Sequence, residues 1–308
     1  MLRALFIALS ESRSLRAFAE RSSLGQRTSA RFVAGTEVAD AIRATAAVNR
    51  FGAAVSIDNL GENVTNPEEA RASARLYHNL LDEIAAHKLN ANISLKLTHM
   101  GLDVDETLAY DIVRALVAKA AGMAPGNFVR VDMEGSPYTE RTLNFVRELH
   151  RIRGNEDSVG TVIQSYMRSA EVDIATLLAE RIRIRLCKGA YKEPEEIAFQ
   201  KKSEVDGNYV KLMKILLKSG IYHGLATHDE TIIKTAKAFA TGEKIPRDAF
   251  EFQMLHGIRR DLQQGLVKEG WRVRVYIPFG TEWYPYLMRR LAERPANVLF
   301  IAKNLLRE

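Results

Sequence analysis

The sequence predicts a single (βα)8 barrel of the TIM type, an α/β fold. Eight short apolar or alternating runs, each bounded by turn residues, occur along the chain. Stretches with helical periodicity separate most of these runs. Strict alternation of strand and helix indicates a parallel sheet, and eight units favour a closed barrel. An open doubly wound sheet is the alternative, but the sequence contains no glycine-rich GxGxxG turn to support it.

The expected strands follow one another at regular intervals. They are AAVSIDNLG from Ala53, NANISLKLT from Asn90, NFVRVDMEG from Asn127, VGTVIQSY from Val159, RIRIRLCKGAY from Arg181, YHGLATHD from Tyr222, FEFQMLHG from Phe250 and RVRVYIPFG from Arg272. Helices are expected at 66–88 and 103–122, the second of which opens with acidic residues that suit a helix N-terminus. No linker divides the chain, so we expect a helical arm at 1–45 and a barrel domain at 46–308.

Composition narrows the class of protein. The chain has 308 residues, of which 46% are hydrophobic, so it can bury a large core. Its net charge of +6 is dispersed, which argues against nucleic acid as a partner and favours anionic small molecules or lipid surfaces. Cys187 is the single cysteine, so an intramolecular disulfide and a metal-thiolate cluster are both excluded and a reducing compartment fits. No window approaches the roughly 18 apolar residues of a membrane span, so we expect a cytoplasmic protein whose membrane contact is peripheral.

Polar side chains collect where the expected strands end. The active site of such a barrel lies at the carboxyl ends of its strands. Seven consecutive strands carry polar residues there: Lys96 and Thr98; Asp132 and Glu134; Gln164 and Tyr166; Arg185, Lys188 and Tyr191; Thr227 and His228; Gln253 and His256; Tyr276. Each one alone has an ordinary explanation, such as a helix cap or a solvated charge. Together they predict one polar mouth.

The mouth is cationic, which predicts an anionic ligand. Lys96, Arg185 and Lys188 are its cations, and Asp132 is a candidate counter-ion. Lys188 is followed by Gly189 and Ala190, a sequence that lets backbone N–H groups approach a phosphate. At the mouth, His228 and His256 are too few and too scattered to propose a metal site, and no serine stands in a nucleophile elbow.

A further pair of cations lies near the end of the chain, in TEWYPYLMRRLAERPAN. If this stretch is helical, Tyr286, Arg289 and Arg290 share one face, because positions three and four apart are neighbours on a helix. A guanidinium pair matches a carboxylate or a phosphate. The stretch alone favours an ordinary surface helix.

With these residues in view, the sequence resembles the proline dehydrogenase family, and most of all its short monofunctional bacterial members. Seven blocks carry the resemblance, in order: SLKLT at 94–98, VDMEG at 131–135, RLCKGAY at 185–191, LATHD at 225–229, FEFQMLHG at 250–257, VRVYIPFG at 273–280 and YLMRRLAERPAN at 286–297. The resemblance implies a distorted FAD-dependent (βα)8 barrel whose last helix lies over the barrel mouth.

The resemblance also implies an activity and a substrate site. The activity is oxidation of L-proline to Δ1-pyrroline-5-carboxylate by hydride transfer to FAD, with a membrane quinone as the electron acceptor. Arg289, Arg290 and Lys96 would hold the proline carboxylate, while Tyr276 and Tyr286 would wall its ring. Asp132 would belong to the catalytic network. A separate pyrroline-5-carboxylate dehydrogenase would take the product, because no aldehyde dehydrogenase domain is expected after the last helix.

For the cofactor, the resemblance distributes roles along the barrel mouth. Arg185 would lie beside the flavin N5 and act in catalysis, with Gln164 at the isoalloxazine edge. The remaining cofactor contacts implied are Met133, Lys188, Gly189, Ala190, Tyr191, Thr227 and His228. An arginine there would stabilise negative charge on the reduced ring.

Two other classes of protein share some of these features. A different barrel enzyme, such as a flavin reductase of methylenetetrahydrofolate or a phosphate-binding aldolase, could use the same cationic mouth. Reaction of a bound flavin with NAD(P)H would identify the folate enzyme. A basic binding protein is the other alternative, which a colourless protein and salt-sensitive nucleic-acid binding would indicate.

Overall fold

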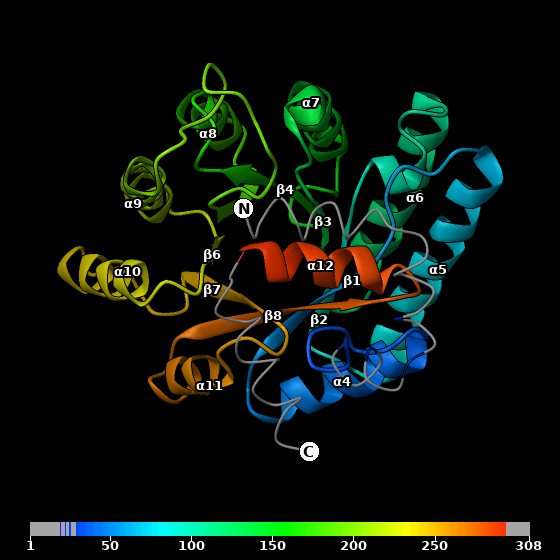
Figure 1. The fold of residues 1–308 in the computed structure, drawn as a ribbon, viewed down its shortest axis with the longest axis horizontal. Helices are drawn as coiled ribbons and strands as arrows, with labels where there is room; N and C mark the ends of the chain where they lie inside the picture. The colour runs from blue at the N-terminus through cyan, green and yellow to red at the C-terminus, as the bar shows by residue number, and fades with distance from the viewer. Residues whose placement is uncertain (1–18, 20–21, 23–24, 26–28, 294–308) are drawn as a thin grey trace.

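The chain closes into a barrel of parallel strands (Figure 1). The computed structural model describes residues 19, 22, 25 and 29–293, the last five of them, 289–293, by their backbone alone. Within this part, each of eight strands pairs with its neighbours in sequence, and β8 pairs with β1 along the register Ala54 to Arg274. The predicted barrel is thereby confirmed over the open sheet.

The strands fall inside the predicted runs, and helices separate them. The strands are β1 Ala54–Asn59, β2 Ala91–Leu95, β3 Val129–Val131, β4 Val159–Gln164, β5 Arg183–Cys187, β6 His223–Ala226, β7 Phe250–Leu255 and β8 Arg272–Phe279. The helices are α4 Val38–Arg50, α5 Pro67–Ala86, α6 Glu106–Ala121, α7 Ser136–Arg151, α8 Ala170–Ala179, α9 Lys202–Lys218, α10 Glu230–Gly242, α11 Arg260–Lys268 and α12 Trp283–Glu293, with a 3-10 turn η1 at Thr98–Met100.

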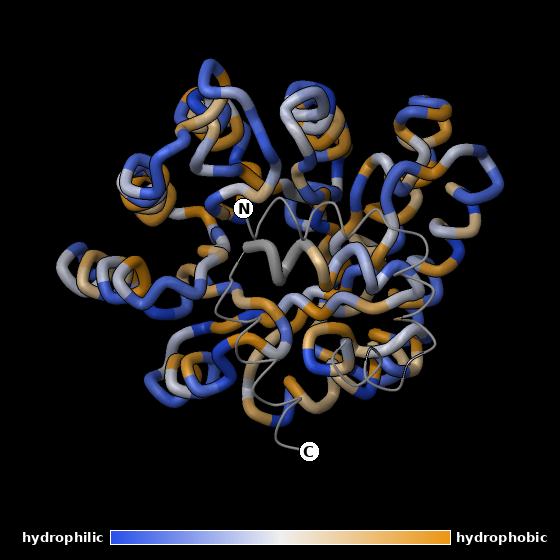
Figure 2. Tube along the Cα trace, viewed as in Figure 1, coloured by the Kyte–Doolittle hydropathy of each residue, from blue (hydrophilic) through white to orange (hydrophobic). Residues whose placement is uncertain are grey.

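Local sequence sets where the helices begin. Asn66 caps α5, since its side chain accepts a hydrogen bond from the Glu69 N–H, and a proline follows it at the first helical position. Asp105 caps α6 in the same way, by accepting from the Leu108 N–H. The cap explains why α6 starts later than the predicted residue 103. Figure 2 shows hydrophilic and hydrophobic residues alternating along the helices around the barrel, as expected of amphipathic helices.

Side chains alternate between the two sides of the sheet, and the alternation divides apolar from polar. On β8, Val273, Val275 and Ile277 are buried in the main hydrophobic core, which lies between the strands and the helices. Arg274 and Tyr276, the residues between them, make their polar contacts inside the barrel. The interior of the barrel is therefore polar, and its carboxyl end becomes the site described below.

Helix α12 lies at the carboxyl end of the barrel. Its residues Trp283, Tyr284, Tyr286 and Leu287 form a second hydrophobic cluster with Phe32, Val33 and Leu60, the last of which directly follows β1. In Figure 1 the helix crosses the centre of the view in front of the strands. A last helix over the mouth is thus present, as predicted. Helix α4 runs through residue 45, where the arm was expected to end, and contacts β1 and β8.

In the part of the chain that the structure describes, no helix is both long enough and apolar enough to cross a bilayer.

Candidate active site

A cavity of about 770 Å³ lies at the carboxyl ends of the strands. Twelve of the residues expected at the site line it: Lys96, Asp132, Met133, Gln164, Arg185, Lys188, Gly189, Ala190, Tyr191, Thr227, His228 and Tyr276. These residues come from six strands or the loops that follow them. The fold therefore brings together side chains that are far apart in sequence.

Arg185 is the centre of the polar network beneath this cavity. Its side chain is 7% exposed, and four acceptors surround the guanidinium. Nη1 donates to Asp132 Oδ1 at 2.7 Å, and Nε donates to Gln253 Oε1 at 2.5 Å. The hydroxyls of Ser94 and Ser56 lie 3.2 Å and 3.3 Å from Nη1 and Nη2. Acceptors on three strands and directly after a fourth fix the plane of the guanidinium, so its place does not depend on solvent.

Asp132 and Tyr276 complete one wall. Tyr276 Oη donates to Asp132 Oδ2 at 2.9 Å, while Ser94 Oγ donates to Oδ1 of the same carboxylate at 2.8 Å. Arg185 lies over the Tyr276 ring, 5.2 Å from its centroid. Burial, followed by the charges of Asp132 and Asp58, holds the pKa of Tyr276 well above its usual value, so the phenol remains a donor. The ring of Tyr276 presents apolar surface to the cavity, which the cations Lys96 and Arg185 also line.

Gln253 connects Arg185 to the buried ion pair of Glu251 and Arg274, deeper in the barrel. Glu251 Oε1 accepts from Gln253 Nε2 at 2.6 Å and from Arg274 Nε at 2.7 Å. Because Glu251 can only accept from the amide nitrogen, the amide oxygen of Gln253 is left to face Arg185. Sequence reasoning placed Gln253 at the mouth without a role and did not identify Glu251. Their spacing of two residues on one strand was the available signal.

Lys96 is held between two carboxylates, neither of which sequence reasoning identified. Its ammonium lies 3.7 Å from Asp58 Oδ2 and 3.6 Å from Glu62 Oε1. Burial opposes the charge of Lys96, but Asp58, Glu62 and Asp132 outweigh it and raise its pKa above the usual value. Asp58 is the last residue but one of β1, whereas the polar pattern was followed only from the second strand. Ser56 and Asp58, two residues apart, carried the same signal as Ser94 and Lys96.

The loop after β5 carries the residues expected at a phosphate. Lys188 Nζ lies 2.6 Å from Asp206 Oδ1 and 2.9 Å from Asp229 Oδ2, so two carboxylates hold the ammonium at the cavity edge. Gly189 has φ of +110°, and a Cβ added there would lie 2.3 Å from the ring of Tyr166. Glycine is required at this position for both its conformation and its size.

Other expected cofactor residues are fixed by backbone contacts. Gln164 donates from Nε2 to the Glu134 carbonyl at 2.8 Å, and Glu134 in turn accepts from the Thr98 hydroxyl at 2.7 Å. The ring of His228 accepts from the Leu255 N–H at 2.9 Å, which ties the end of β6 to the end of β7. These bonds hold polar groups from neighbouring strands along the cavity wall.

Of the three site residues predicted on the last helix, the structure describes the side chain of Tyr286 but not those of Arg289 and Arg290. Tyr286 is buried in the second hydrophobic cluster, rather than among the residues that line the cavity. Arg289 and Arg290 belong to α12, but their side chains lie outside the described residues. Among the residues that are described, no group of three or more histidine, cysteine, aspartate or glutamate side chains could hold a metal ion.

Comparison with known proteins gives a consistent result. The sequence model of one family, described as Proline dehydrogenase, matches residues 41–303. Proline dehydrogenase 1 of Bacillus subtilis is 42% identical over 311 residues, which cover 100% of both chains. Proline dehydrogenase of Deinococcus radiodurans is 42% identical over 280 residues, which cover 90% of this chain and 89% of that protein.

Solved structures share the fold. Proline utilization A (PutA) from Bdellovibrio bacteriovorus, inactivated by N-propargylglycine, superposes with a TM-score of 0.79 at 26% identity. The match covers 87% of this chain and 32% of that one, so the present chain spans about a third of the larger protein.

Proposed function

The chain belongs to the proline dehydrogenase family, and from this premise we propose that it oxidises L-proline to Δ1-pyrroline-5-carboxylate with FAD as the hydride acceptor. The observation that carries the proposal is the buried guanidinium of Arg185, which four acceptors hold beside Tyr276 and Asp132 at the cavity. A small ring with one carboxylate needs cations on one side and aromatic carbon on the other, and this wall offers both.

The residues present fit FAD. The cavity volume of about 770 Å³ is within the range of cofactor sites. At its edge, Lys188 supplies a positive charge, and the backbone of Gly189 is free of a Cβ that would meet Tyr166. These features suit a pyrophosphate, so we assign Lys188, Gly189 and Ala190 to the phosphates. Met133, Gln164, Tyr191, Thr227 and His228 would hold the remainder of the cofactor.

Bound FAD would supply the hydride acceptor, its N5 atom. The chain supplies binding and orientation. Arg185 would place a fixed positive charge beside the isoalloxazine ring, where negative charge develops on reduction. Lys96, Arg289 and Arg290 would hold the carboxylate of proline, and Tyr276 and Tyr286 would limit the movement of its ring. Fixed orientation accounts for a large share of catalysis.

The further partners in the proposal follow the family resemblance. We propose a membrane quinone as the final electron acceptor and a separate pyrroline-5-carboxylate dehydrogenase as the consumer of the product. A cytoplasmic protein that meets the membrane peripherally would satisfy both. The excess of basic residues, with a net charge of +6, favours contact with an anionic lipid surface.

One experiment tests cofactor and substrate together. The visible absorption spectrum of the purified protein is recorded before and after anaerobic addition of L-proline. We expect flavin bands that bleach with L-proline. Bands that persist with L-proline and bleach with NAD(P)H would overturn the substrate in favour of a folate-type reductase. A protein that binds no flavin, even after incubation with FAD, would overturn the cofactor.

A further inference from the structure

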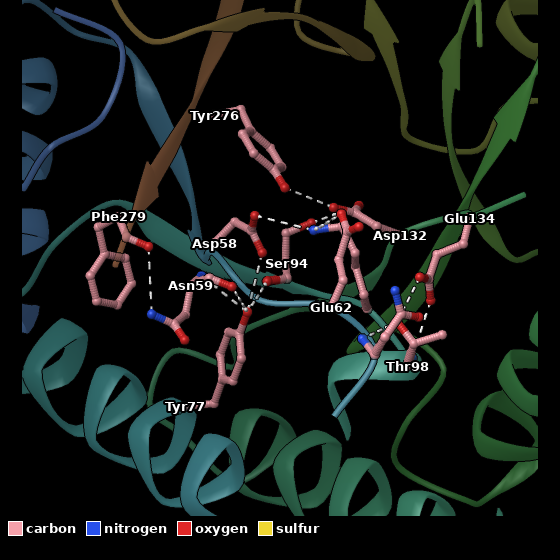
Figure 3. Close-up of polar contacts among 12 residues, drawn as sticks. Asp58, Asn59, Glu62, Tyr77, Ser94, Thr98, Asp132, Glu134, Tyr276 and Phe279 are labelled. Atoms are coloured by element: carbon pink, nitrogen blue, oxygen red, sulfur yellow. Dashed lines mark hydrogen bonds and ion pairs between the residues drawn. The ribbon is translucent and has the colours of Figure 1, made fainter. Parts of the chain in front are cut away.

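Asp58 lies directly behind the cavity wall. The residue as a whole is 1% exposed, and it is not among the described residues that line the cavity. Oδ1 lies 3.2 Å from the hydroxyl of Tyr77, a fully buried residue of helix α5. That hydroxyl also accepts from the Asn59 N–H at 3.1 Å. Figure 3 shows Asp58 between Tyr77 on one side and the pair Tyr276 and Asp132 on the other. The same hydroxyl lies 2.9 Å from the Ser94 carbonyl, so Tyr77 packs against Asp58 from outside the barrel and shares its one proton between two acceptors.

The two carboxylates that hold Lys96 differ in depth. The side chain of Asp58 is 2% exposed and that of Glu62 is 24% exposed, while Lys96 between them is 13% exposed. Asp58 draws the ammonium toward the barrel interior, and Glu62 draws it toward the open side. Neutralising Asp58 would leave Glu62 as the only charged member of this pair of carboxylates, and the ammonium would move outward. A buried carboxylate that loses its charge thereby changes where the cation of the site stands.

We propose that Asp58 is the positioning residue for Lys96, which it holds in place for the substrate carboxylate without touching the substrate itself. The inference rests on the proposed function, because it assigns Lys96 to the carboxylate of proline. Asp58 lies behind the site, and its effect on substrate binding is transmitted by Lys96.

The charge of Asp58 depends on its surroundings. The groups that face it are Tyr77 from α5, Lys96 after β2, Asp132 after β3 and Tyr276 on β8. Burial raises the pKa of Asp58 to about 6, with Lys96 acting against the shift and Asp132 acting with it. Since protonation would remove the charge that holds Lys96, carboxylate binding should weaken as the pH falls through this value.

The test is a double-mutant cycle on the flavin-loaded enzyme. Asp58→Asn keeps the shape and loses the charge, so KM for L-proline should rise about tenfold with kcat changed less than about twofold. Lys96→Met should raise KM further. In the double variant, Asp58→Asn should add less than about twofold to the effect of Lys96→Met, because its route is already removed. Independent, multiplied effects would overturn the proposal, as would an unchanged KM in Asp58→Asn.

Glu251→Gln is the matched control. Glu251 is also buried, accepts from a tyrosine, Tyr222, and pairs with a cation, Arg274, but it does not contact Lys96. Its effect on KM should therefore multiply with that of Lys96→Met. If Asp58 and Glu251 show the same coupling to Lys96, the effect belongs to any buried carboxylate, and the assignment of Asp58 fails.

A second measurement covers the case in which Asp58→Asn does not fold. Binding of cyclopentanecarboxylate, a proline analogue without an ionisable amine, is followed by calorimetry between pH 8 and 5.5 in the unsubstituted enzyme and in Lys96→Met. The unsubstituted enzyme should lose affinity around the pKa of Asp58, and Lys96→Met should lack that step. A step of equal size in both proteins contradicts the proposal.

The proposed function and the role of Asp58 can be contradicted separately. If the unsubstituted protein does not oxidise L-proline, the proposed function is contradicted, and the role given to Lys96 falls with it. If the protein oxidises L-proline but the cycle is additive, the proposed function stands and only the role of Asp58 is overturned.

Discussion

Arg185 shows how single residues create this site. A guanidinium buried without partners would cost several kcal/mol, yet here three acceptors on other strands and Asp132, directly after β3, satisfy it. Two of these acceptors are themselves fixed, Asp132 by Tyr276 and Gln253 by Glu251. Movement of one member leaves another without its partner, so the group is held as a unit.

Gly189 offers a prediction at the same scale. Gly189→Ala would place a Cβ 2.3 Å from the Tyr166 ring at φ of +110°, which should destabilise the fold by about 2 kcal/mol and lower flavin content. Gly207→Ala is the control, since this exposed glycine of α9 has nothing within 4 Å and alanine there should stabilise the helix by about 0.5–1 kcal/mol. Chemical unfolding and the flavin-to-protein absorbance ratio measure both. Equal flavin content in the two variants would contradict the prediction.

Residue types at strand ends made much of the site predictable. Lys96, Asp132, Arg185 and Tyr276 all line one cavity, because the carboxyl ends of parallel strands meet. Asp58 could not be weighted in the same way, since an aspartate at a strand end is as often a cap. Its importance comes from Tyr77, which reaches it from a helix and whose contact no local pattern encodes.

At the scale of elements, the loop after β5 is tied to a distant helix. Glu193 accepts from the Ser136 N–H at 2.7 Å and from the Ser136 hydroxyl at 2.6 Å, at the first residue of α7. The residue before that helix, Gly135, has no side chain with which to cap it. A carboxylate from another part of the chain thus takes the place of a local cap and anchors the loop that carries Gly189 and Tyr191.

Glu193→Ala should therefore affect both the helix and the loop. We expect the free energy of unfolding to fall by about 1–2 kcal/mol, because two hydrogen bonds at a helix N-terminus are lost. Flavin retention during dialysis should fall as well, since the loop lines the cavity. Glu195→Ala, an exposed change in the same loop, should stay within about 0.5 kcal/mol of the parent. Lower stability with full flavin retention would mean that Glu193 stabilises helix α7 but does not hold the loop at the cavity.

For the whole molecule, buried histidines set the response to acid. Burial lowers the pKa of His223 to about 3 and the pKa values of His99 and His256 to about 4. In the unfolded chain a histidine titrates near pH 6.5. Between pH 6.5 and 4 the unfolded state therefore binds protons that the folded state does not, so stability falls as the pH falls. Asp58 acts in the opposite direction between pH 6 and 4, because its folded pKa is raised.

His223→Gln isolates one of these contributions. Between pH 4 and 6, the free energy of unfolding of the variant should change less steeply with pH than that of the parent. The expected difference in slope is about 1.4 kcal/mol per pH unit, which corresponds to one proton. Urea unfolding at intervals across this range measures the slope, which is independent of any constant loss of stability. Parallel curves for parent and variant would mean that the folded state does not exclude this proton.

The architecture as a whole was predictable because its signal repeats. Each strand, and a helix between most of the strands, was recognisable from periodicity, and eight repeats of one unit leave few topologies. The residues at which each element begins and ends were less predictable. Strand β3, for example, spans only Val129–Val131 of the longer run that begins at Asn127. Hydrogen bonding to neighbouring strands, rather than the apolar run itself, decides where a strand ends. The arm at 1–45 stays a prediction.

Closure of the barrel also governs the time at which the protein can fold. The bond from Asn59 Nδ2 to the Phe279 carbonyl joins residues 220 positions apart. At ribosomal rates of about 5–20 residues per second, the first strand waits about 10–45 seconds for its last partner to be synthesised. Its open edge is a template for unwanted pairing throughout that interval. A chaperone that shields the nascent edge would therefore raise the yield of folded enzyme more than one that acts after release.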